Sequence, residues 1–595
     1  MTMALNEPAP AHLTTSTSTI SPGRFERYIW RWTGERLVWA VLAIVVFVVA
    51  ILPLFYTVDA AFYRETRVGL SSDRSLTAVL NVYATAEYWA YLASALWLAA
   101  IVTALSLVVG MVMALLVART DIPLKGTFDL LIIMPLFLSP FTGMIAWIAL
   151  GSKKTGFING TILALFRSVG IELAPLINVW SFSGAVWVMF LFFCPFVYLF
   201  TVGNLRGMDS SLEEAARTTG ASVMQTLWRI TLPMSLPAIL AAGMLVFVLA
   251  AEMYTIPGII GSNAGFTTLP WKIYEDSTVF PVHRAHAAAA GTLLLWVTIL
   301  GIWLQRRITR QSERFVTVTG KGFRGRPLKL GAWKPAALVI IVFYILCADV
   351  LPFGSLLISS FMKYSAPAIT TEIFTLKHYH DIFTFQNFRD ALWNTLLLAI
   401  LSGAACVLIG FMITFMELRR PSPETRFLAF LGVLPVAVPG LVYGIGLLWV
   451  YLQTPLYGTI WILLLAFVAK FLPYGIVVSR AGILQIHPEM EQSARISGAS
   501  PLLALRKIII PLVKPTLIAI LFFVMLQSIK ELSASVLLYS QRSQVLAVLT
   551  WHYMDAGEYQ FAAAIGVLQT ILMIAMVVVT RMVFGVQLEK TMAKT

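Results

Sequence analysis

The sequence predicts an all-α polytopic membrane protein with twelve transmembrane helices, arranged as two parallel repeats of six. Of its 595 residues, 59% are hydrophobic and only 12% are charged, whereas soluble proteins contain about 25% charged residues. The mean hydropathy of +0.82 agrees with this class. A polar stretch that occurs twice, 278 residues apart, predicts the two repeats.

Twelve apolar runs are long enough to cross the roughly 30 Å apolar core of a bilayer. We expect each to be a helix, because lipid offers no partner to an unpaired backbone group. The runs lie near 37–58, 90–118, 129–150, 184–204, 237–260 and 286–305, and then near 335–358, 391–416, 427–451, 459–479, 515–537 and 562–584. The predicted parts are an N-terminal lead (1–36), a first half (37–307), a linker (308–334) and a second half (335–595).

The distribution of Lys and Arg predicts the orientation. With the N-terminus inside, 29 of the 43 basic residues lie in segments expected to be cytoplasmic and 12 in outer segments. Positive charge is retained on the cytoplasmic side of membrane proteins. We therefore expect both termini, the lead and the linker to be cytoplasmic, in the bacterial inner membrane. The same bias explains the net charge of +14 without a nucleic-acid partner.

The repeated stretch reads EEAARTTGASVMQTLWRITLPMSLP over 213–237 and EQSARISGASPLLALRKIIIPLVKP over 491–515. In the first copy, Ser211 and Glu214 have the spacing of a capping box, which begins a helix. Gly220 stands where a helix ends in a left-handed residue. Ser222 is expected to begin a second helix and Pro233 to end it. The sequence therefore predicts a helix, a glycine turn and a second helix.

The second copy predicts the same unit with partly different residues. Pro488 suits the first turn of a helix, since its φ is fixed and it lacks an N–H. Gly498 takes the turn position, Ser500 is expected to begin the second helix, and Pro511 to end it. Both units lie on the predicted cytoplasmic side.

This pattern resembles the EAA loop of permease subunits of ATP-binding-cassette (ABC) importers: E-A-A, three residues, G, nine residues, I, one residue, L-P. The first copy matches each named position, with Glu214, Ala215, Ala216, Gly220, Ile230, Leu232 and Pro233. The second copy has Gln492, Ser493 and Ala494 for E-A-A and Ile510 for the leucine. The other reading is an ordinary amphipathic hairpin, but two copies on one predicted side favour the importer.

The resemblance implies that both loops dock onto ATPase subunits. The residues expected to couple the ATPases to transport are Glu213, Glu214, Ala215, Ala216, Gly220, Ile230 and Pro233, and in the second copy Glu491, Ala494, Gly498, Ile508 and Pro511. The implied partners are two cytoplasmic ATPase subunits, a periplasmic substrate-binding protein and the lipid bilayer. We expect no enzymatic activity and no cofactor, because the chain contains no G-x-x-x-x-G-K-[ST] phosphate loop.

Ionisable residues inside apolar runs indicate a candidate substrate pathway. Glu252 aligns to within one residue with Glu531, which follows Lys530. Charged side chains cost a few kcal/mol at the bilayer centre and usually face a pathway or a partner. The other interpretation is that Lys530 and Glu531 lie at a helix end near headgroups or pair with other helices.

No metal site is expected from the sequence. His283 with His286, and His378 with His380, lie on the predicted outer side. Two histidines bind metal only with further ligands, so solvated loop residues are the favoured interpretation. About twenty apolar residues, roughly 162–182, are additional in the first half and are interpreted as an interfacial or re-entrant helix or as an irregular loop.

For the substrate, the chain is most similar to ferric-iron importer permeases. The resemblance rests on Lys530-Glu531-Leu532, on Glu252 with Ile256-Pro257, on the T-x-T-G-K-G-F-R junction (317–324) and on the fusion of both halves. Permeases for 2-aminoethylphosphonate, thiamine or polyamines are the alternatives. An ion-driven twelve-helix secondary transporter is a less favoured function, since it gives no reason for the repeated loop. A membrane-embedded enzyme is also less favoured, because it would need clustered His, Asp or Glu on facing helices, which the sequence does not indicate.

Overall fold

The computed structural model describes residues 34–66, 69–208, 211–312, 328–366 and 371–584. Most of the predicted N-terminal lead and the 317–324 junction therefore lie outside the described residues. Residues 1–45 and 46–595 form two compact units, which are described separately. Of the first unit, the structure describes only residues 34–45, which belong to helix α2 (Gly34–Val46).

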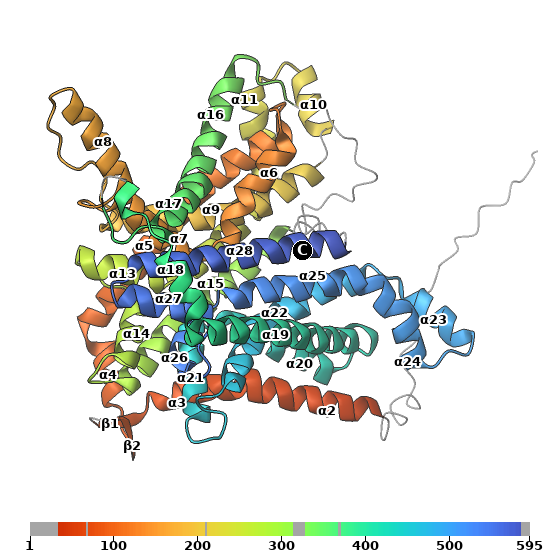
Figure 1. The fold of residues 1–595 in the computed structure, drawn as a ribbon. Coiled ribbons are helices and arrows are strands. Elements are labelled where there is room, and N and C mark those ends of the chain that lie inside the picture. Colours follow the sequence, from red (N-terminus) through yellow and green to blue (C-terminus); the bar gives the residue numbers. More distant parts are fainter. Residues whose placement is uncertain (1–33, 67–68, 209–210, 313–327, 367–370, 585–595) are drawn as a thin grey trace, which may run out of the picture. The chain divides into compact units, whose positions relative to one another are not determined.

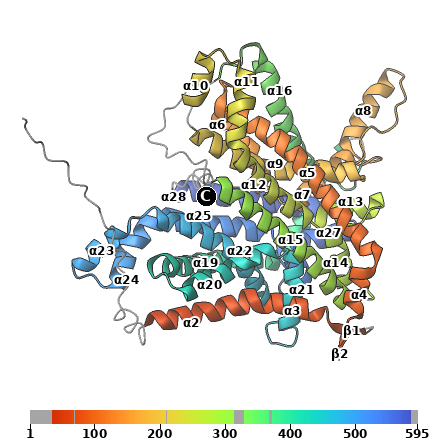
Figure 2. The ribbon, with the colours of Figure 1, turned by 180° about the vertical axis from the view of Figure 1, so that it is seen from behind.

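Among its described residues, the regular elements of the second unit are helices and one short β-hairpin, as the ribbon shows from two opposite sides (Figures 1 and 2). The elements of its first half are η1 (Phe47–Ile51), α3 (Leu52–Ala60), β1 (Tyr63–Thr66), β2 (Gly69–Arg74), α4 (Thr77–Ala84), α5 (Ala86–Arg119), α6 (Lys125–Ile133), η2 (Met134–Phe137), α7 (Pro140–Gly151), α8 (Phe157–Ser168), α9 (Phe182–Gly207), α10 (Ser211–Thr218), α11 (Val223–Thr226), η3 (Leu227–Thr231), α12 (Leu232–Ala251), α13 (Thr255–Ala264), α14 (Leu269–Thr278) and α15 (Arg284–Ser312).

The second half repeats much of this order. Its elements are η5 (Gly331–Trp333), α16 (Lys334–Ile345), η6 (Leu346–Val350), α17 (Leu351–Ser360), η7 (Thr371–Ile373), α18 (Lys377–Thr384), α19 (Gln386–Arg419), α20 (Pro423–Val433), η8 (Leu434–Ala437), α21 (Gly440–Tyr451), α22 (Ile460–Leu484), α23 (Pro488–Ile496), α24 (Pro501–Ala504), η9 (Leu505–Ile509), α25 (Ile510–Ile529), α26 (Ser535–Leu538), α27 (Leu546–Asp555) and α28 (Tyr559–Phe584).

The predicted spans are confirmed, with two of them sharply bent. The described residues contain ten helices long and apolar enough to cross a membrane, or up to twelve if each bent pair counts as one span. The bent pairs are 125–151, which turns by 97°, and 423–451, which turns by 112°. Pro135 and Pro435 lie just before the two turns. A proline inside a helix removes a hydrogen bond and favours such a break.

Prolines follow a π-helical segment at four places, and this corrects one prediction. Each segment closes with a hydrogen bond between residues five apart, such as that from the Leu232 N–H to the Leu227 carbonyl. The residue directly after the donor is a proline in all four cases: Pro53, Pro233, Pro352 and Pro511. The prediction that Pro233 and Pro511 end the second helix of each loop is wrong, because helix continues through both. The wider π turn relieves the clash between the proline ring and an earlier carbonyl.

Each half contains a corresponding group of three long helices. In the first half α5 packs on α9 and α12, and in the second half α19 packs on α22 and α25. The repeated glycines Gly110 and Gly410 lie at these crossings. A Cβ on Gly110 would lie 2.8 Å from the Cβ of Val197, and one on Gly410 would lie 2.6 Å from the Gly475 carbonyl carbon. The close crossing of the helices therefore requires glycine at both sites.

Helix α3 of the first half and helix α17 of the second each pack against the other half. The hydroxyl of Thr57 in α3 donates to the Val442 carbonyl of α21 at 3.3 Å. Correspondingly, the hydroxyl of Ser355 in α17 donates to the Ala146 carbonyl of α7 at 3.1 Å. The two halves are therefore interlocked, while the predicted boundaries at 307 and 335 stay a prediction.

The additional segment of the first half combines a helix with an irregular stretch. Helix α8 continues to Ser168, and residues 171–178 have no regular structure. The buried amide of Asn159 binds this stretch, since its nitrogen donates to the Ile177 carbonyl at 2.7 Å and its oxygen accepts from the Ile177 N–H at 3.0 Å. The segment therefore contains both a helix and an irregular loop, while an interfacial or re-entrant position of the helix stays a prediction.

Candidate functional site

The two repeated loops have the same backbone geometry. Gly220 and Gly498 both have a φ of 90°, which only glycine adopts without strain. The N–H of Ala221 donates to the Ala216 carbonyl at 3.0 Å, and the N–H of Ala499 donates to the Ala494 carbonyl at 3.0 Å. These bonds close the glycine turn between the two helices of each loop, as the sequence predicts.

The helix starts also agree with the predictions. Helix α10 begins at Ser211, whose side chain lies outside the described residues, and α23 begins at Pro488. The Ser222 hydroxyl accepts from the Gln225 N–H at 3.2 Å. In the second loop the Ser500 hydroxyl accepts from the Leu503 N–H at 3.2 Å. Each serine therefore caps the second helix of its loop.

An arginine at the end of a long helix holds each loop. Arg119 ends α5, and its Nε lies 3.7 Å from Oε1 of Glu213. Arg419 ends α19, and its Nε lies 3.6 Å from Oε2 of Glu491. The side chains of both pairs are at most 17% exposed. We call these two ion pairs the loop latches.

Each latch arginine also binds the backbone that leads into its loop. Nη2 of Arg119 donates to the Met208 carbonyl at 3.1 Å, and Nη2 of Arg419 donates to the Ile486 carbonyl at 3.0 Å. Met208 and Ile486 are 278 residues apart, as are the two glutamates. The duplicated latch therefore ties the start of each loop to the first long helix of the same half.

The two latches differ in one hydrogen bond. The hydroxyl of Thr231 donates to Oε1 of Glu213 at 2.7 Å, whereas Ile509 occupies the corresponding position in the second half. Glu213 is buried, while Glu214 and Ala215, which match the E-A-A motif, are exposed. The buried glutamate thus positions the first loop, and the motif glutamate faces outward.

The other predicted coupling residues lie around the turns. Gly220, Gly498, Pro233 and Pro511 are exposed. Ala216, Ile230, Glu491, Ala494 and Ile508 are partly buried. Sequence comparison of the loops alone did not find Arg119 and Arg419 as partners, although they recur at an offset of 300. This recurrence of an arginine in both halves is the sequence signal that could have identified the two residues.

The end of the linker is fastened beside the first latch. The N–H of Leu328 donates to the Arg119 carbonyl at 2.8 Å, and the Leu328 carbonyl accepts from the Asp121 N–H at 3.1 Å. Asp121 also accepts from the Leu330 N–H at 2.9 Å and pairs with Lys334 at 3.0 Å. The Leu330 N–H, and then the Lys334 ammonium, lower the pKa of Asp121. The second half therefore begins from a fixed point next to the first loop.

A charged cluster lies where α12 and α25 end. Nζ of Lys470, in α22, lies 2.7 Å from Oε2 of the buried Glu531, and Oε1 of Glu531 accepts from the Ala534 N–H at 3.0 Å. Lys530 extends into the other half, where its Nζ donates to the Leu136 carbonyl of η2 at 2.9 Å. Glu252 is partly buried at the end of α12, and the charges of Lys470 and Glu531 act on it.

The structure thus pairs the predicted pathway residue Glu531 with a lysine of α22, binds Lys530 to the other half and places Glu252 at the corresponding end of α12. It adds Lys470, to which the sequence analysis gives no role. A lysine in an apolar run is itself a signal, because its charge requires a partner. What the sequence did not provide was the identity of that partner, which lies 61 residues away.

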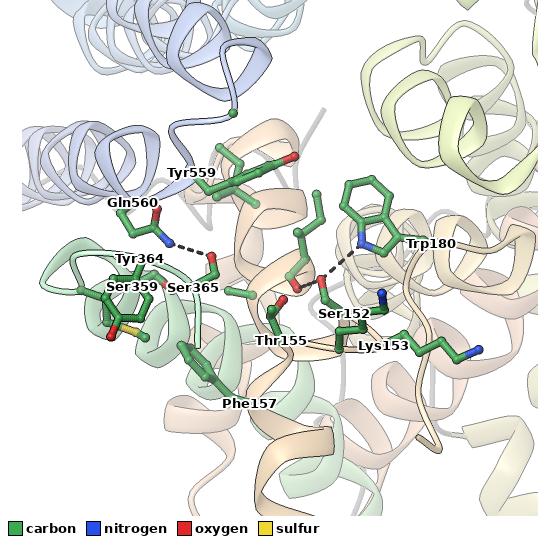
Figure 3. A pocket seen from close by; sticks show the side chains of 16 residues that line it. Ser152, Lys153, Thr155, Phe157, Trp180, Ser359, Tyr364, Ser365, Tyr559 and Gln560 are labelled. Carbon is green, nitrogen blue, oxygen red and sulfur yellow. Dashed lines mark hydrogen bonds between the residues drawn. The ribbon is translucent and has the colours of Figure 1, made fainter. Parts of the chain in front are cut away.

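A cavity of 670 Å³ lies between residues of the two halves, on the face predicted to be outside (Figure 3). The first half contributes Ser152, Lys153 and Trp180, and the second contributes Ser359 and Gln560. The indole of Trp180 donates to the Ser152 hydroxyl at 3.2 Å. The cavity wall therefore combines hydroxyl and basic side chains with apolar ones such as Ile145 and Met362.

The chain matches the family model of the binding-protein-dependent transport system inner membrane component twice, over residues 106–314 and 406–594. Each match contains one of the repeated loops, and together they cover more than half of the chain. This confirms the resemblance inferred from the loops and the duplication of the permease unit.

Individual relatives are distant but extensive. The chain is 25% identical over 511 residues to the ferric transport system permease protein FbpB of Actinobacillus pleuropneumoniae, covering 84% of this chain and 72% of the relative. It is 27% identical over 245 residues to the putative 2-aminoethylphosphonate transport system permease protein PhnU of Salmonella typhimurium, covering 40% of this chain and 81% of the relative. A solved bacterial ABC transporter involved in alginate import has 18% identity and a TM-score of 0.35, over 42% of this chain and 93% of that chain.

The loops, the duplicated six-helix pattern and the two family matches agree. The chain belongs to the family of binding-protein-dependent transport system inner membrane components, and it is a multi-pass permease of the ABC importer type.

Proposed function

We propose that this chain is the membrane-spanning subunit of a ferric-iron ABC importer, driven by two cytoplasmic ATPase subunits through the 213–237 and 491–515 loops. A periplasmic binding protein delivers the cargo, and closure of the ATPase dimer switches access to the pathway between the halves. The chain itself catalyses no covalent reaction, since the partners hydrolyse the nucleotide.

The duplicated latch carries the proposal. A loop that transmits force must be stiff within itself and firmly joined to the helices that it moves. Each loop has a closed glycine turn, and each is joined to a long helix by an arginine that contacts both a glutamate and a backbone carbonyl. Two equivalent loops match a motor of two ATPase subunits.

The surface of the loops supports docking of a protein partner. Ile496 in the second loop is 87% exposed and Trp228 in the first is 64% exposed. Met490 and Leu503 add smaller exposed apolar surfaces. Apolar side chains flanked by charges are typical of a protein interface. We propose that these side chains enter the grooves of the two ATPase subunits.

The path of the chain supports the proposed orientation. Counting each bent pair as one span, six spans separate the loop after α9 from the loop after α22. An even number of crossings is what two loops on the same side require. The excess of Lys and Arg on that side supports a cytoplasmic location, with both termini on the same side.

The proposed cargo rests on relatives. Ferric transport permeases match more than three quarters of this chain, so that both halves lie in one relative, whereas the 2-aminoethylphosphonate permeases, themselves covered to 81% and 90%, match about two fifths of it. A phosphonate remains the second candidate, because Lys153 and Lys154 line the cavity in Figure 3 and can bind an anion. An ion-driven secondary transporter is disfavoured, because the family to which the chain belongs uses a separate binding protein.

The test is uptake by proteoliposomes that contain the permease, its ATPase subunits and its binding protein. We expect ATP-dependent, vanadate-sensitive uptake of radioactive ferric iron, with little competition from 2-aminoethylphosphonate. Uptake without an ATPase would refute the mechanism. Phosphonate uptake in place of iron would refute the cargo alone.

Variants at the glycine turn test the coupling directly. A Cβ on Gly220 or Gly498 meets nothing within 4 Å, so substitution there changes backbone strain without a clash. Gly220→Ala should cost about 1 to 2 kcal/mol, whereas Gly220→Asn should cost less, because Asn tolerates the left-handed region. We expect iron uptake to fall in the order wild type, Asn, Ala, Pro, with Glu214→Arg also inactive. Equal uptake by all variants would exclude a coupling role.

A further inference from the structure

Three metal-binding side chains meet on the face predicted to be outside. Glu65 lies in β1, His283 lies just before α15, and His286 lies in the first turn of α15. Their ligand atoms all lie within 4.8 Å of one another. The sequence analysis judged the two histidines to be solvated loop residues because no third ligand was visible. The fold supplies that ligand from a position 218 residues away.

The local structure fixes the three groups in place. His283 and His286 are three residues apart at a helix start, a spacing that places side chains on one face. The strands β1 and β2 pair as an antiparallel hairpin, and Arg74 of this hairpin pairs with Asp59 at 2.6 Å. Oε1 of Glu65 accepts from the backbone N–H of His286 at 3.0 Å. That bond leaves Oε2 facing the two rings.

The distances agree with the edges of a metal coordination shell. Oε2 of Glu65 lies 3.1 Å from Nδ1 of His283 and 2.9 Å from Nδ1 of His286. Ligand atoms that lie about 2.1 Å from one metal ion are about 3.0 Å apart when they meet at a right angle. Both separations are therefore compatible with a shared ion.

The orientation of His286 provides a second, independent observation. Its buried Nδ1 lies 2.9 Å from Oε2 of Glu65 but, within the described part of the chain, is not in hydrogen-bond geometry with that oxygen or with another acceptor. A buried polar atom without a partner calls for an explanation, and an ion is one.

A neighbouring amide can hold the outer nitrogen of the same ring. The amide nitrogen of Asn81, in α4, lies 3.3 Å from Nε2 of His286. If the amide is turned by 180°, its oxygen takes this place, accepts from Nε2–H and leaves Nδ1 free for a metal. Such a partner is typical of histidines that bind metal.

We propose that Glu65, His283 and His286 form a binding site for a divalent first-row transition-metal ion. Two imidazoles with one carboxylate suit zinc, iron or cobalt, whereas magnesium and calcium prefer oxygen ligands alone. A bound ion would join the hairpin to the start of α15 and leave positions for water beside the half-exposed His283. The site does not depend on the cargo proposed above.

The test uses the full-length chain in lipid nanodiscs, purified without a histidine tag and stripped with a chelator. Zn²⁺ is titrated calorimetrically, and Co²⁺ is titrated while its visible absorption is recorded. We expect one equivalent to bind to the wild type. Glu65→Gln and the double variant His283→Ala/His286→Ala should weaken binding more than 100-fold, and Asn81→Ala should weaken it about 10-fold.

The matched control is His378→Ala/His380→Ala, which removes the other histidine pair on the same predicted face. Nε2 of His378 lies 2.9 Å from the Met362 carbonyl, so this pair has a backbone partner instead. The control should bind Zn²⁺ like the wild type. Absence of stoichiometric binding by the wild type, or unchanged binding by the Glu65 and His283/His286 variants, would overturn the proposal.

A chemical measurement covers the case in which a variant fails to fold. Diethylpyrocarbonate modifies histidine rings, and mass spectrometry locates the modified residues. In the wild type, Zn²⁺ should protect His283 and His286 but leave the exposed His380 reactive. Equal modification of His283 and His286 with and without Zn²⁺ would contradict the site.

Discussion

Neutralising Glu213 should uncouple the first loop from α5. Glu213→Gln keeps the shape of the side chain and an oxygen that can accept from Thr231, but it removes the charge that faces Arg119. Two unit charges 3.7 Å apart attract by about 4.5 kcal/mol at an effective dielectric constant of 20. Desolvation offsets part of this attraction, and the ion pair lacks hydrogen-bond geometry at Nε within the described residues. We therefore expect a net loss of about 2 kcal/mol.

That loss lowers the population of the loop geometry that an ATPase subunit recognises. A cost of about 2 kcal/mol corresponds to roughly 30-fold weaker binding. The assay is the affinity of fluorescent ATPase subunits for the permease in nanodiscs, with iron uptake measured in parallel. Arg119→Ala should weaken binding at least as much, because it also removes the bond to the Met208 carbonyl. Glu491→Gln and Arg419→Ala test the second latch in the same way.

A double variant and a surface control complete the experiment. If the pair acts as a unit, Glu213→Gln/Arg119→Ala should bind the ATPase no more weakly than the worse single variant. Arg206→Ala breaks an ion pair with Asp129 in which the arginine is 47% exposed, and it should change affinity by at most about fivefold. Wild-type affinity in all the latch variants, or fully additive losses in the double variant, would refute the latch.

The remaining predictions concern the cluster and the interlocked helices. Glu531→Gln should leave the partly buried Lys470 unpaired and lower the free energy of unfolding by about 3 to 5 kcal/mol, seen as a lower melting temperature. The double variant Lys470→Met/Glu531→Leu should recover stability but not iron uptake, and recovery of both would remove the pair from the pathway. Glu252→Ala should reduce uptake while ATPase binding stays normal, and unchanged uptake would argue against its role. Gly446→Ala places a Cβ 2.1 Å from the Pro53 carbonyl oxygen and should destabilise the chain by about 1 to 3 kcal/mol, whereas Gly354→Ala, with nothing within 4 Å, should melt like the wild type.

The spans were predictable because lipid leaves the backbone few choices. Hydropathy located all twelve apolar runs, and the loop pattern located both glycine turns. The prediction that Pro233 and Pro511 end a helix was wrong because a proline does so only where its ring clashes with a carbonyl of the preceding turn. The π-helical segments at 227–231 and 505–509 relieve that clash, and local propensity rules do not anticipate such a segment.

The candidate site was predictable only in part. Glu252, Lys530 and Glu531 were recognised because charges in apolar runs are costly. Lys470 received no role, because nothing in a single sequence says which helix lies opposite Glu531. The same limit applied to Arg119 and Arg419, because two further spans separate each arginine from its glutamate in the loop.

The sequence by itself determined that the chain spans a membrane, that it is duplicated and that each half carries a loop of two helices joined by a glycine turn. These properties depend on composition and on patterns among residues close together in the chain. Only the tertiary structure decided which distant charges pair, how the first helix of each half packs on the other, and that Glu65 meets His283 and His286. Such contacts depend on how helices cross in space, and the energy of a buried charge or ligand is set by neighbours that lie far away in the sequence.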